Sequence, residues 1–148
     1  MDASLLKQLQ TARPRILVVG DIMLDRYTWG IVERVSPEAP VVVLRADSEE
    51  VRLGGAASVA GLLRGLQAEV SIAGVVGADG GAAVVQRLFR DAKIDTSLVY
   101  EDVSRPTTVK ERFLGRPEHR LPGQLLRVDH ESRAPLDETA EAQLLAAM

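Results

Sequence analysis

Residues 51–77 read VRLGGAASVAGLLRGLQAEVSIAGVVG, and this stretch decides the fold. It opens with a glycine pair, continues in an apolar pattern with helical spacing, and ends in a largely apolar run. The middle part predicts a helix, and the run at residues 68–77 predicts a strand buried on both faces of a sheet. A helix that leads into such a strand is typical of an α/β fold with a parallel sheet.

The flanking sequence repeats this unit. Residues 15–21 (RILVVGD) are a β-branched run with a glycine stop, which predicts a first strand, again buried on both faces. Residues 96–100 predict a third, short strand. Residues 79–93 predict a second helix, whose inward side we assign to Val84, Val85, Leu88 and Phe89. The order strand–helix–strand–helix–strand predicts an α/β body with right-handed crossovers.

Two segments interrupt this order and predict a small β lid attached to the body. Residues 31–52 are too long for an ordinary connection between a strand and its helix. Residues 106–131 contain two strand-like runs around a Gly/Pro-rich loop, which is typical of a hairpin. In the first run Thr108, Lys110 and Arg112 share one pleated face, so that face is polar. The body is then left with residues 1–30, 53–105 and 132–148.

The C-terminal residues 135–148 (PLDETAEAQLLAAM) predict a helix capped by Asp137. This helix ends in apolar residues, without the glycine, the basic last turn or the proline that commonly follow a helix. A sheet of three strands would be unusually small for a complete α/β domain. We therefore expect the C-terminal half of the fold to be missing from this chain.

The composition narrows the function classes. The 148 residues are 46% hydrophobic and 26% charged, as is usual for a globular domain, and the net charge of −3 argues against a nucleic-acid partner. Without cysteine there is neither a disulfide framework nor a thiolate metal site. The first residues lack the pattern of a signal peptide, and no apolar run approaches the ~18 residues of a membrane span. We expect a cytoplasmic protein with no membrane partner.

Neither standard phosphate-binding motif is present. There is no GxxxxGK[ST], which excludes a P-loop, and no GxGxxG follows the first strand. The pair Gly54–Gly55 leaves two interpretations open. It is either a tight turn that packs a helix against the sheet or a backbone that closes on a ligand.

Asp21 and Asp25 follow the first strand, at the edge where open α/β sheets place their ligands. A carboxylate at this edge can accept hydrogen bonds from a pair of sugar hydroxyls, whereas an aspartate that caps its own loop explains the position equally well. For Asp21 both interpretations stay open. We expect Tyr27 and Trp29 to pack rather than to stack on a substrate.

Lys110 and Arg112 also have two interpretations. They form either a solvated strand face or a site for an anionic ligand. His119 and His130 have no partner at the spacing of metal ligands, so we predict no metal site.

Six motifs occur together in the order and spacing of a known family: VVGDIMLDRYTWG, RVSPEAPVVVL, RLGGAASVAGLLRGLQAEV, GVVGADGGA, PTTVKERFL and QLLRVDHE. They resemble the ribokinase-like carbohydrate kinases, in particular the branch of D-glycero-β-D-manno-heptose-7-phosphate kinases. The resemblance covers about residues 15–131 and implies a parallel-sheet body with a small β lid. It also implies ATP- and Mg²⁺-dependent phosphorylation of the anomeric hydroxyl of heptose 7-phosphate, for the synthesis of ADP-heptose and the lipopolysaccharide core.

The resemblance also assigns the sugar site. Asp25 matches the sugar-binding carboxylate, and Gly54 and Gly55 match the loop that lies against the sugar. Ser58 stands where the family has an asparagine, so a short hydroxyl replaces a longer amide. For the substrate phosphate we expect Lys110 or Arg112.

The family's GAGD motif is absent from this chain. In the family this motif supplies the catalytic base and the helix that holds the transferred phosphate, so we assign no catalytic residue here and place most of the ATP site outside. We expect the 148 residues alone to be inactive. A kinase for another sugar or nucleoside, and a non-catalytic module that binds a sugar phosphate or pairs through its lid, remain alternatives. With Val41, Val43 and Phe113 in need of cover, we expect a homodimer through the lid.

Overall fold

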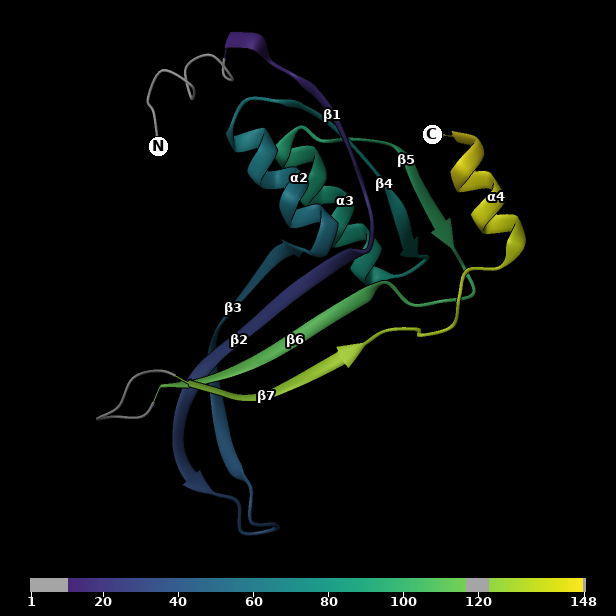
Figure 1. The fold of residues 1–148 in the computed structure, drawn as a ribbon. Helices are drawn as coiled ribbons and strands as arrows, with labels where there is room; N and C mark the ends of the chain where they lie inside the picture. Colours follow the sequence, from purple (N-terminus) through teal and green to yellow (C-terminus); the bar gives the residue numbers. More distant parts are fainter. Residues whose placement is uncertain (1–10, 117–122, 148) are drawn as a thin grey trace.

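The computed structural model describes residues 11–116 and 123–147, which form two sheets joined end to end (Figure 1). We call the first the body sheet; it is parallel, with the strand order β1-β4-β5. Its strands are β1 (Arg15–Val19), β4 (Glu69–Gly77) and β5 (Asp95–Asp102). The alternation of strands and helices predicted from the sequence is thus confirmed, and the fold is of the α/β class.

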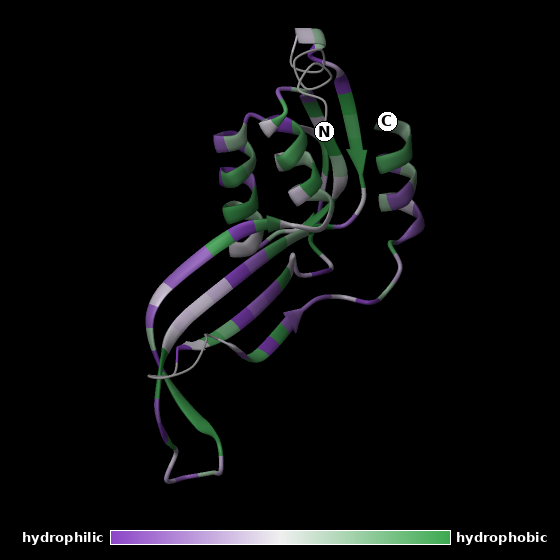
Figure 2. Cartoon of the chain, turned by 60° about the vertical axis from the view of Figure 1, so that its left-hand side comes forward, coloured by the Kyte–Doolittle hydropathy of each residue, from purple (hydrophilic) through white to green (hydrophobic). Residues whose placement is uncertain are grey.

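The helices α2 (Gly55–Gly65) and α3 (Gly80–Ala92) lie on one side of the body sheet, and α4 (Glu138–Ala147) lies on the other, beside β5 (Figures 1 and 2). The inward side predicted for α3 is confirmed. Val85 and Phe89 are fully buried, while Val84 and Leu88 are partly buried against the same core. The predicted cap of α4 is also present, because Ala140 N donates to Asp137 Oδ1 at 2.8 Å.

One expectation about the body is wrong. Burial on both faces holds for most of β4 but not for β1. Ile16 and Val18 pack against the core, whereas Leu17 and Val19 on the opposite face are exposed. Among the described strands β1 lies at the edge of the body sheet, and α4, the described helix on this side, lies beside β5 and leaves Leu17 and Val19 exposed.

The second sheet, which we call the lid sheet, has the order β3-β2-β6-β7. Its strands are β2 (Ile22–Val35), β3 (Val42–Gly54), β6 (Thr108–Arg116) and β7 (Gly123–His130). The sheet is mixed, since β2 runs parallel to β6 and the other neighbours are antiparallel. The two inserted segments therefore form one β layer, with the predicted hairpin at β6 and β7.

The predicted boundary between body and lid needs correction. β2 starts at Ile22, so residues 22–30 belong to the lid sheet and not to the body. Ile22 and Leu24 point into the core while Met23 and Asp25 do not, which is the period-two burial of a strand. Only Gly20 and Asp21 separate this strand from β1, so apart from the glycine stop no loop marked the change of sheet.

The base of the lid sheet is anchored in the body. Ile22, Leu24 and Val109 lie in the same buried cluster as the helices α2 and α3. A polar connection lies nearby: Asp79, the cap of α3, accepts from Ala82 N at 2.9 Å and from Thr107 N at 2.8 Å. Since Thr107 directly precedes β6, this carboxylate ties the lid to a body helix.

No helix in the described part of the chain is long and apolar enough to span a bilayer.

Candidate functional site

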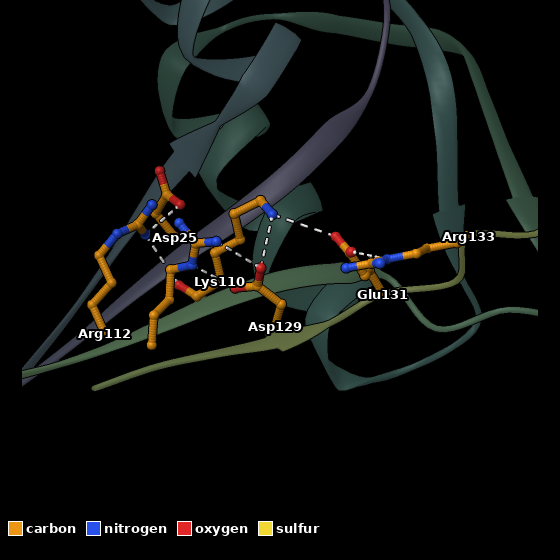
Figure 3. Close-up of polar contacts among 7 residues, drawn as sticks. Asp25, Lys110, Arg112, Asp129, Glu131 and Arg133 are labelled. Carbon is orange, nitrogen blue, oxygen red and sulfur yellow. Dashed lines mark hydrogen bonds and ion pairs between the residues drawn. The ribbon is translucent and has the colours of Figure 1, made fainter.

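Residues predicted separately for a sugar and for a phosphate meet on one face of the lid sheet. In the register of β2 and β6, Asp25 lies beside Lys110, and Tyr27 lies beside Arg112. Arg112 Nη1 donates to Asp25 Oδ1 at 2.6 Å, and both side chains are half-buried (Figure 3). The hydrogen bond that Arg112 donates to Asp25 raises the pKa of Arg112 further above its usual value. The structure therefore pairs the carboxylate predicted for the sugar with one of the two cations predicted for the phosphate.

Gly54 leaves room for the Asp25 carboxylate. A Cβ added at Gly54 would lie 2.8 Å from Asp25 Oδ2, so a larger residue would push the carboxylate aside. Gly55 has a φ of +55°, and a Cβ there would lie 2.5 Å from the Asp21 carbonyl oxygen. The glycine pair thus makes a tight turn before α2, as the packing interpretation expects. The same turn lies against Asp25, the carboxylate that the ligand-binding interpretation needs.

Asp21 shapes this turn through its backbone, since Ala56 N donates to Asp21 O at 2.9 Å. The Ser58 hydroxyl donates to Gly55 O at 2.8 Å, within the first turn of α2. Among the hydrogen bonds of the described residues, none links Ser58 to Asp25 or Arg112. The structure therefore brings Asp25 and Gly54 together and leaves Ser58 occupied with its own helix.

Lys110 lies between two carboxylates that the sequence reasoning missed (Figure 3). Its Nζ is 3.4 Å from Asp129 Oδ2 and 3.4 Å from Glu131 Oε2. Asp129 is also paired with Arg127, whose Nε is 2.9 Å from Oδ1, and Glu131 is paired with Arg133 at 3.0 Å. The signal was present in the hairpin: RVDHE (residues 127–131) carries a charge at every second position, and the antiparallel register places Asp129 opposite Lys110 and Arg127 opposite Arg112.

These pairs shift the acidities of both carboxyls. Burial raises the pKa of Asp129, but hydrogen bonds from Arg127 and Lys110 outweigh it and hold the pKa below its usual range. The pKa of Glu131 is lowered chiefly by the hydrogen bond from Arg133 and then by Lys110. Both groups are therefore charged at neutral pH and neutralise the cations beside them.

Tyr27 packs as predicted, but against charge. The guanidinium carbon of Arg52 lies 5.0 Å from the centre of its ring, and that of Arg112 lies 5.2 Å away. Arg52 is on β3 and Arg112 is on β6, so the two cations reach the ring from the two strands that flank β2. Trp29 makes a similar contact with Arg116 at 5.3 Å.

We call one set of residues on this side of the lid sheet the charged face: Asp25, Tyr27, Glu50, Arg52, Lys110, Arg112 and Asp129. Next to it a cavity of about 320 Å³ opens at the carboxyl ends of β1 and β4. Asp21 and Gly74 line it from the body, and Thr108 and Glu131 line it from the lid. This is the edge where open parallel sheets bind their ligands, and the volume is at the small end of ligand sites.

Metal-ligating side chains do not gather in the described residues. Within residues 11–116 and 123–147, no three His, Asp or Glu side chains lie close enough to hold a metal ion. His130 Nε2 is 3.5 Å from Glu111 Oε2, on the other face of the lid sheet. His119 lies outside the described residues.

The family model described as pfkB family carbohydrate kinase matches residues 13–144. A D-beta-D-heptose 7-phosphate kinase from Bordetella bronchiseptica is 52% identical over 120 residues, which are 81% of this chain and 36% of the relative. The Bifunctional protein HldE from Helicobacter hepaticus is 43% identical over 129 residues, which are 87% of this chain and 26% of the relative. The chain thus spans between about a quarter and about a third of these relatives.

Solved structures share the fold at low sequence identity. A carbohydrate kinase from Agrobacterium tumefaciens matches with a TM-score of 0.61 at 23% identity, over 78% of this chain and 35% of that one. The Arabidopsis thaliana ribokinase solved with ribose and ATP matches with a TM-score of 0.57 at 18% identity, over 80% of this chain and 36% of that one. The expected ribokinase-like fold is therefore confirmed for the part of the fold that this chain contains.

Proposed function

The chain belongs to the pfkB family of carbohydrate kinases, and we propose that it is the sugar-phosphate-binding part of a heptose 7-phosphate kinase. The whole enzyme would transfer the γ-phosphoryl group of ATP to the anomeric hydroxyl of the sugar, in the synthesis of ADP-heptose for the lipopolysaccharide core. One observation carries the proposal: the 2.6 Å pair between Asp25 and Arg112 sets a carboxylate and a guanidinium side by side. A phosphorylated sugar needs both, an acceptor for its hydroxyls and a donor for its phosphate.

Each side chain then has a separate part in holding the substrate. Asp25 accepts hydrogen bonds from two neighbouring hydroxyls, and its charge strengthens them. Gly54, which has no side chain, lets the sugar and the carboxylate approach the backbone of β3. Arg112 and Lys110 neutralise the phosphate at the other end of the sugar. Holding both ends fixes the anomeric hydroxyl in one position, and phosphoryl transfer depends largely on such positioning.

ATP bound with Mg²⁺ supplies the transferred phosphoryl group and neutralises its charge. The described residues offer no cluster of metal ligands, and the sequence has no P-loop lysine. No residue of this chain is therefore assigned to ATP or to Mg²⁺. What this chain contributes is sugar binding and orientation.

Binding tests the proposal directly. We expect heptose 7-phosphate to bind the chain, in calorimetry, at least about 10-fold more tightly than unphosphorylated heptose, because the phosphate adds charge-assisted hydrogen bonds. Ribose 5-phosphate and adenosine serve as competitors for the alternative of another sugar or nucleoside kinase. Tighter binding of either one would contradict the heptose assignment.

Turnover gives a second, opposite expectation for the 148 residues alone. Incubated with ATP, Mg²⁺ and heptose 7-phosphate, they should release no ADP above the blank. Turnover by this chain would show that it holds a base and a phosphate site that we place elsewhere.

A homodimer through the lid is supported by one further observation. At the far end of the β2–β3 hairpin the side chains of Val35, Val41 and Val42 are exposed, and Figure 2 shows one of the two strands as hydrophobic there. Phe113 and Val43, which we expected to need cover, are half-buried. Light scattering should show a dimer for the chain and a monomer for Val35→Asp/Val42→Asp. A monomer at every concentration for the unaltered chain would rule out the lid dimer.

A further inference from the structure

We infer that Tyr27 and Arg52 complete the phosphate-binding half of this site, with Tyr27 as the positioning residue that brings Arg52 beside Arg112. The inference rests on the proposed function, because it names which cations receive the phosphate of the sugar. Neither residue carries a phosphate-binding signal in the sequence. Only the pairing of β2 with both β3 and β6 brings Arg52 and Arg112 to the ring of Tyr27 from its two sides.

The ring of Tyr27 contacts the guanidinium groups of both Arg52 and Arg112. Without a compensating group the positive charges of these two side chains would repel one another. At 5.0 and 5.2 Å both are within the range in which a ring face attracts a cation. Tyr27 therefore stabilises two neighbouring positive charges and limits the directions in which their side chains extend.

Both guanidinium groups also have N–H groups that can donate to a ligand. Arg112 makes its described hydrogen bonds through Nη1 alone, to Asp25 and to the carbonyl oxygen of Lys110. Its Nε and Nη2 groups have no hydrogen-bond partner among the described residues. Such a fork matches two oxygens of a phosphate.

Arg52 is engaged, but by a weak partner. Its Nε and Nη2 donate to the two oxygens of Glu50 at 2.6 and 2.8 Å. The side chains are 58% and 46% exposed, and ion pairs in such positions contribute little because water competes for them. A phosphate carries up to two negative charges and three acceptor oxygens, so it replaces the single charge of Glu50 at low cost.

Reciprocal variants of the full chain test this assignment, with heptose 7-phosphate and unphosphorylated heptose as titrants. Arg52→Gln should weaken binding of the phosphorylated sugar about 10-fold and leave that of the unphosphorylated sugar unchanged. Glu50→Gln frees Arg52 and should tighten binding of the phosphorylated sugar, by up to about 5-fold. Trp29, the single tryptophan, lies on the same strand as Tyr27 and gives a fluorescence signal beside calorimetry.

The lid sheet offers a matched control. Arg45 and Glu33 form another exposed pair at 2.6 Å, with side chains 61% and 50% exposed, outside the charged face. Arg45→Gln and Glu33→Gln should change the affinity for neither sugar. Tyr27→Leu should weaken binding of the phosphorylated sugar only, and Tyr27→Phe, which keeps the ring, should recover much of the loss. Circular dichroism of each variant establishes that it is folded.

The outcomes separate the two proposals. If the unaltered chain prefers the phosphorylated sugar and Arg52→Gln keeps that preference, the inference is wrong and the proposed function stands. The same holds if Arg45→Gln weakens binding as much as Arg52→Gln does, because the effect is then one of general charge. If the unaltered chain binds neither sugar, the proposed function is wrong and this inference fails with it.

Discussion

In the body, α3 presents Val85 and Phe89 to a core in which both are fully buried, whereas the charged face of the lid sheet carries hardly an apolar side chain. The body core is stabilised by removing apolar surface from water. The charged face gains little from burial, because each of its cations is compensated by a carboxylate beside it. Substitutions in the body core are therefore expected to lower the stability of the chain. Substitutions on the charged face are expected to lower its affinity for the ligand.

The largest effect is expected in the core. Phe89→Ala removes a fully buried ring and leaves a cavity that the packed helices fill only in part. The free energy of unfolding should fall by about 3–5 kcal/mol, measured by urea denaturation. Leu62→Ala, on the exposed side of α2, is the control and should cost less than about 0.5 kcal/mol. Equal losses in the two variants would mean that α3 does not pack as described.

Asp25→Asn should have a smaller effect on free energy, confined to the ligand. The amide keeps the shape but replaces an acceptor oxygen with a donor group, so a pair of sugar hydroxyls loses an acceptor. A hydrogen bond to a charged group is worth about 1.5–3 kcal/mol, which predicts sugar affinity weaker by about 10- to 150-fold. The measurement is a sugar titration, in the whole enzyme at saturating ATP, where the affinity for ATP should hardly move.

The control for Asp25 is Asp21→Asn. Asp21 supports the Gly55 turn through its backbone oxygen, which this substitution leaves in place, so its effect on the sugar should be smaller. An unchanged sugar affinity in Asp25→Asn would remove Asp25 from the site.

Asp79 lies where the two regions meet, and its removal should have the smallest effect. Asp79→Ala deletes the cap of α3 and the bond to Thr107, and such caps contribute about 0.5–2 kcal/mol. Burial raises the pKa of Asp79, but hydrogen bonds from Ala82 and Thr107 outweigh it and lower the pKa. Because the folded-state pKa is the lower one, the stabilisation is present above the unfolded pKa of about 3.9 and is lost as the pH falls through the folded value.

Denaturation of the unaltered chain and of Asp79→Ala at a series of pH values measures this contribution. The difference in stability should be largest at neutral pH and should shrink with acidification below about pH 4. Asp137→Ala, which removes the single described bond to Ala140, is the matched cap in α4. A difference that stays constant down to pH 2 would exclude the carboxylate as its source.

The sequence predicted what depends on local pattern. Periodicity located the helix α3 and its buried residues, and the glycine pair marked the start of α2. The path of β2 could not be predicted, because the chain passes from the body sheet into the lid sheet within two residues, Gly20 and Asp21, without a longer loop. The exposure of one face of β1 could not be predicted either, because an edge strand and a central strand can have the same composition.

The candidate site was predictable only in part, for the same reason. Asp25 and Gly54 follow from motifs, and Lys110 and Arg112 from alternation along one strand. Their partners Arg52, Tyr27 and Asp129 depend on which strands pair and in which register, and these pairings are non-local. A strand read alone shows which face is polar but not which charges lie opposite.

The cations of the charged face are each paired with a carboxylate, and this pairing affects which ligands the face can bind. A simple anion that binds Nε and Nη2 of Arg112 brings a second negative charge close to Asp25, which stays paired with Nη1 at 2.6 Å. Under the proposed function a phosphorylated sugar offsets this repulsion, because its hydroxyls donate to the Asp25 carboxylate while its phosphate binds the guanidinium. The proposed site would therefore favour molecules that carry both a phosphate and hydroxyl groups at the right separation over anions that lack the hydroxyls.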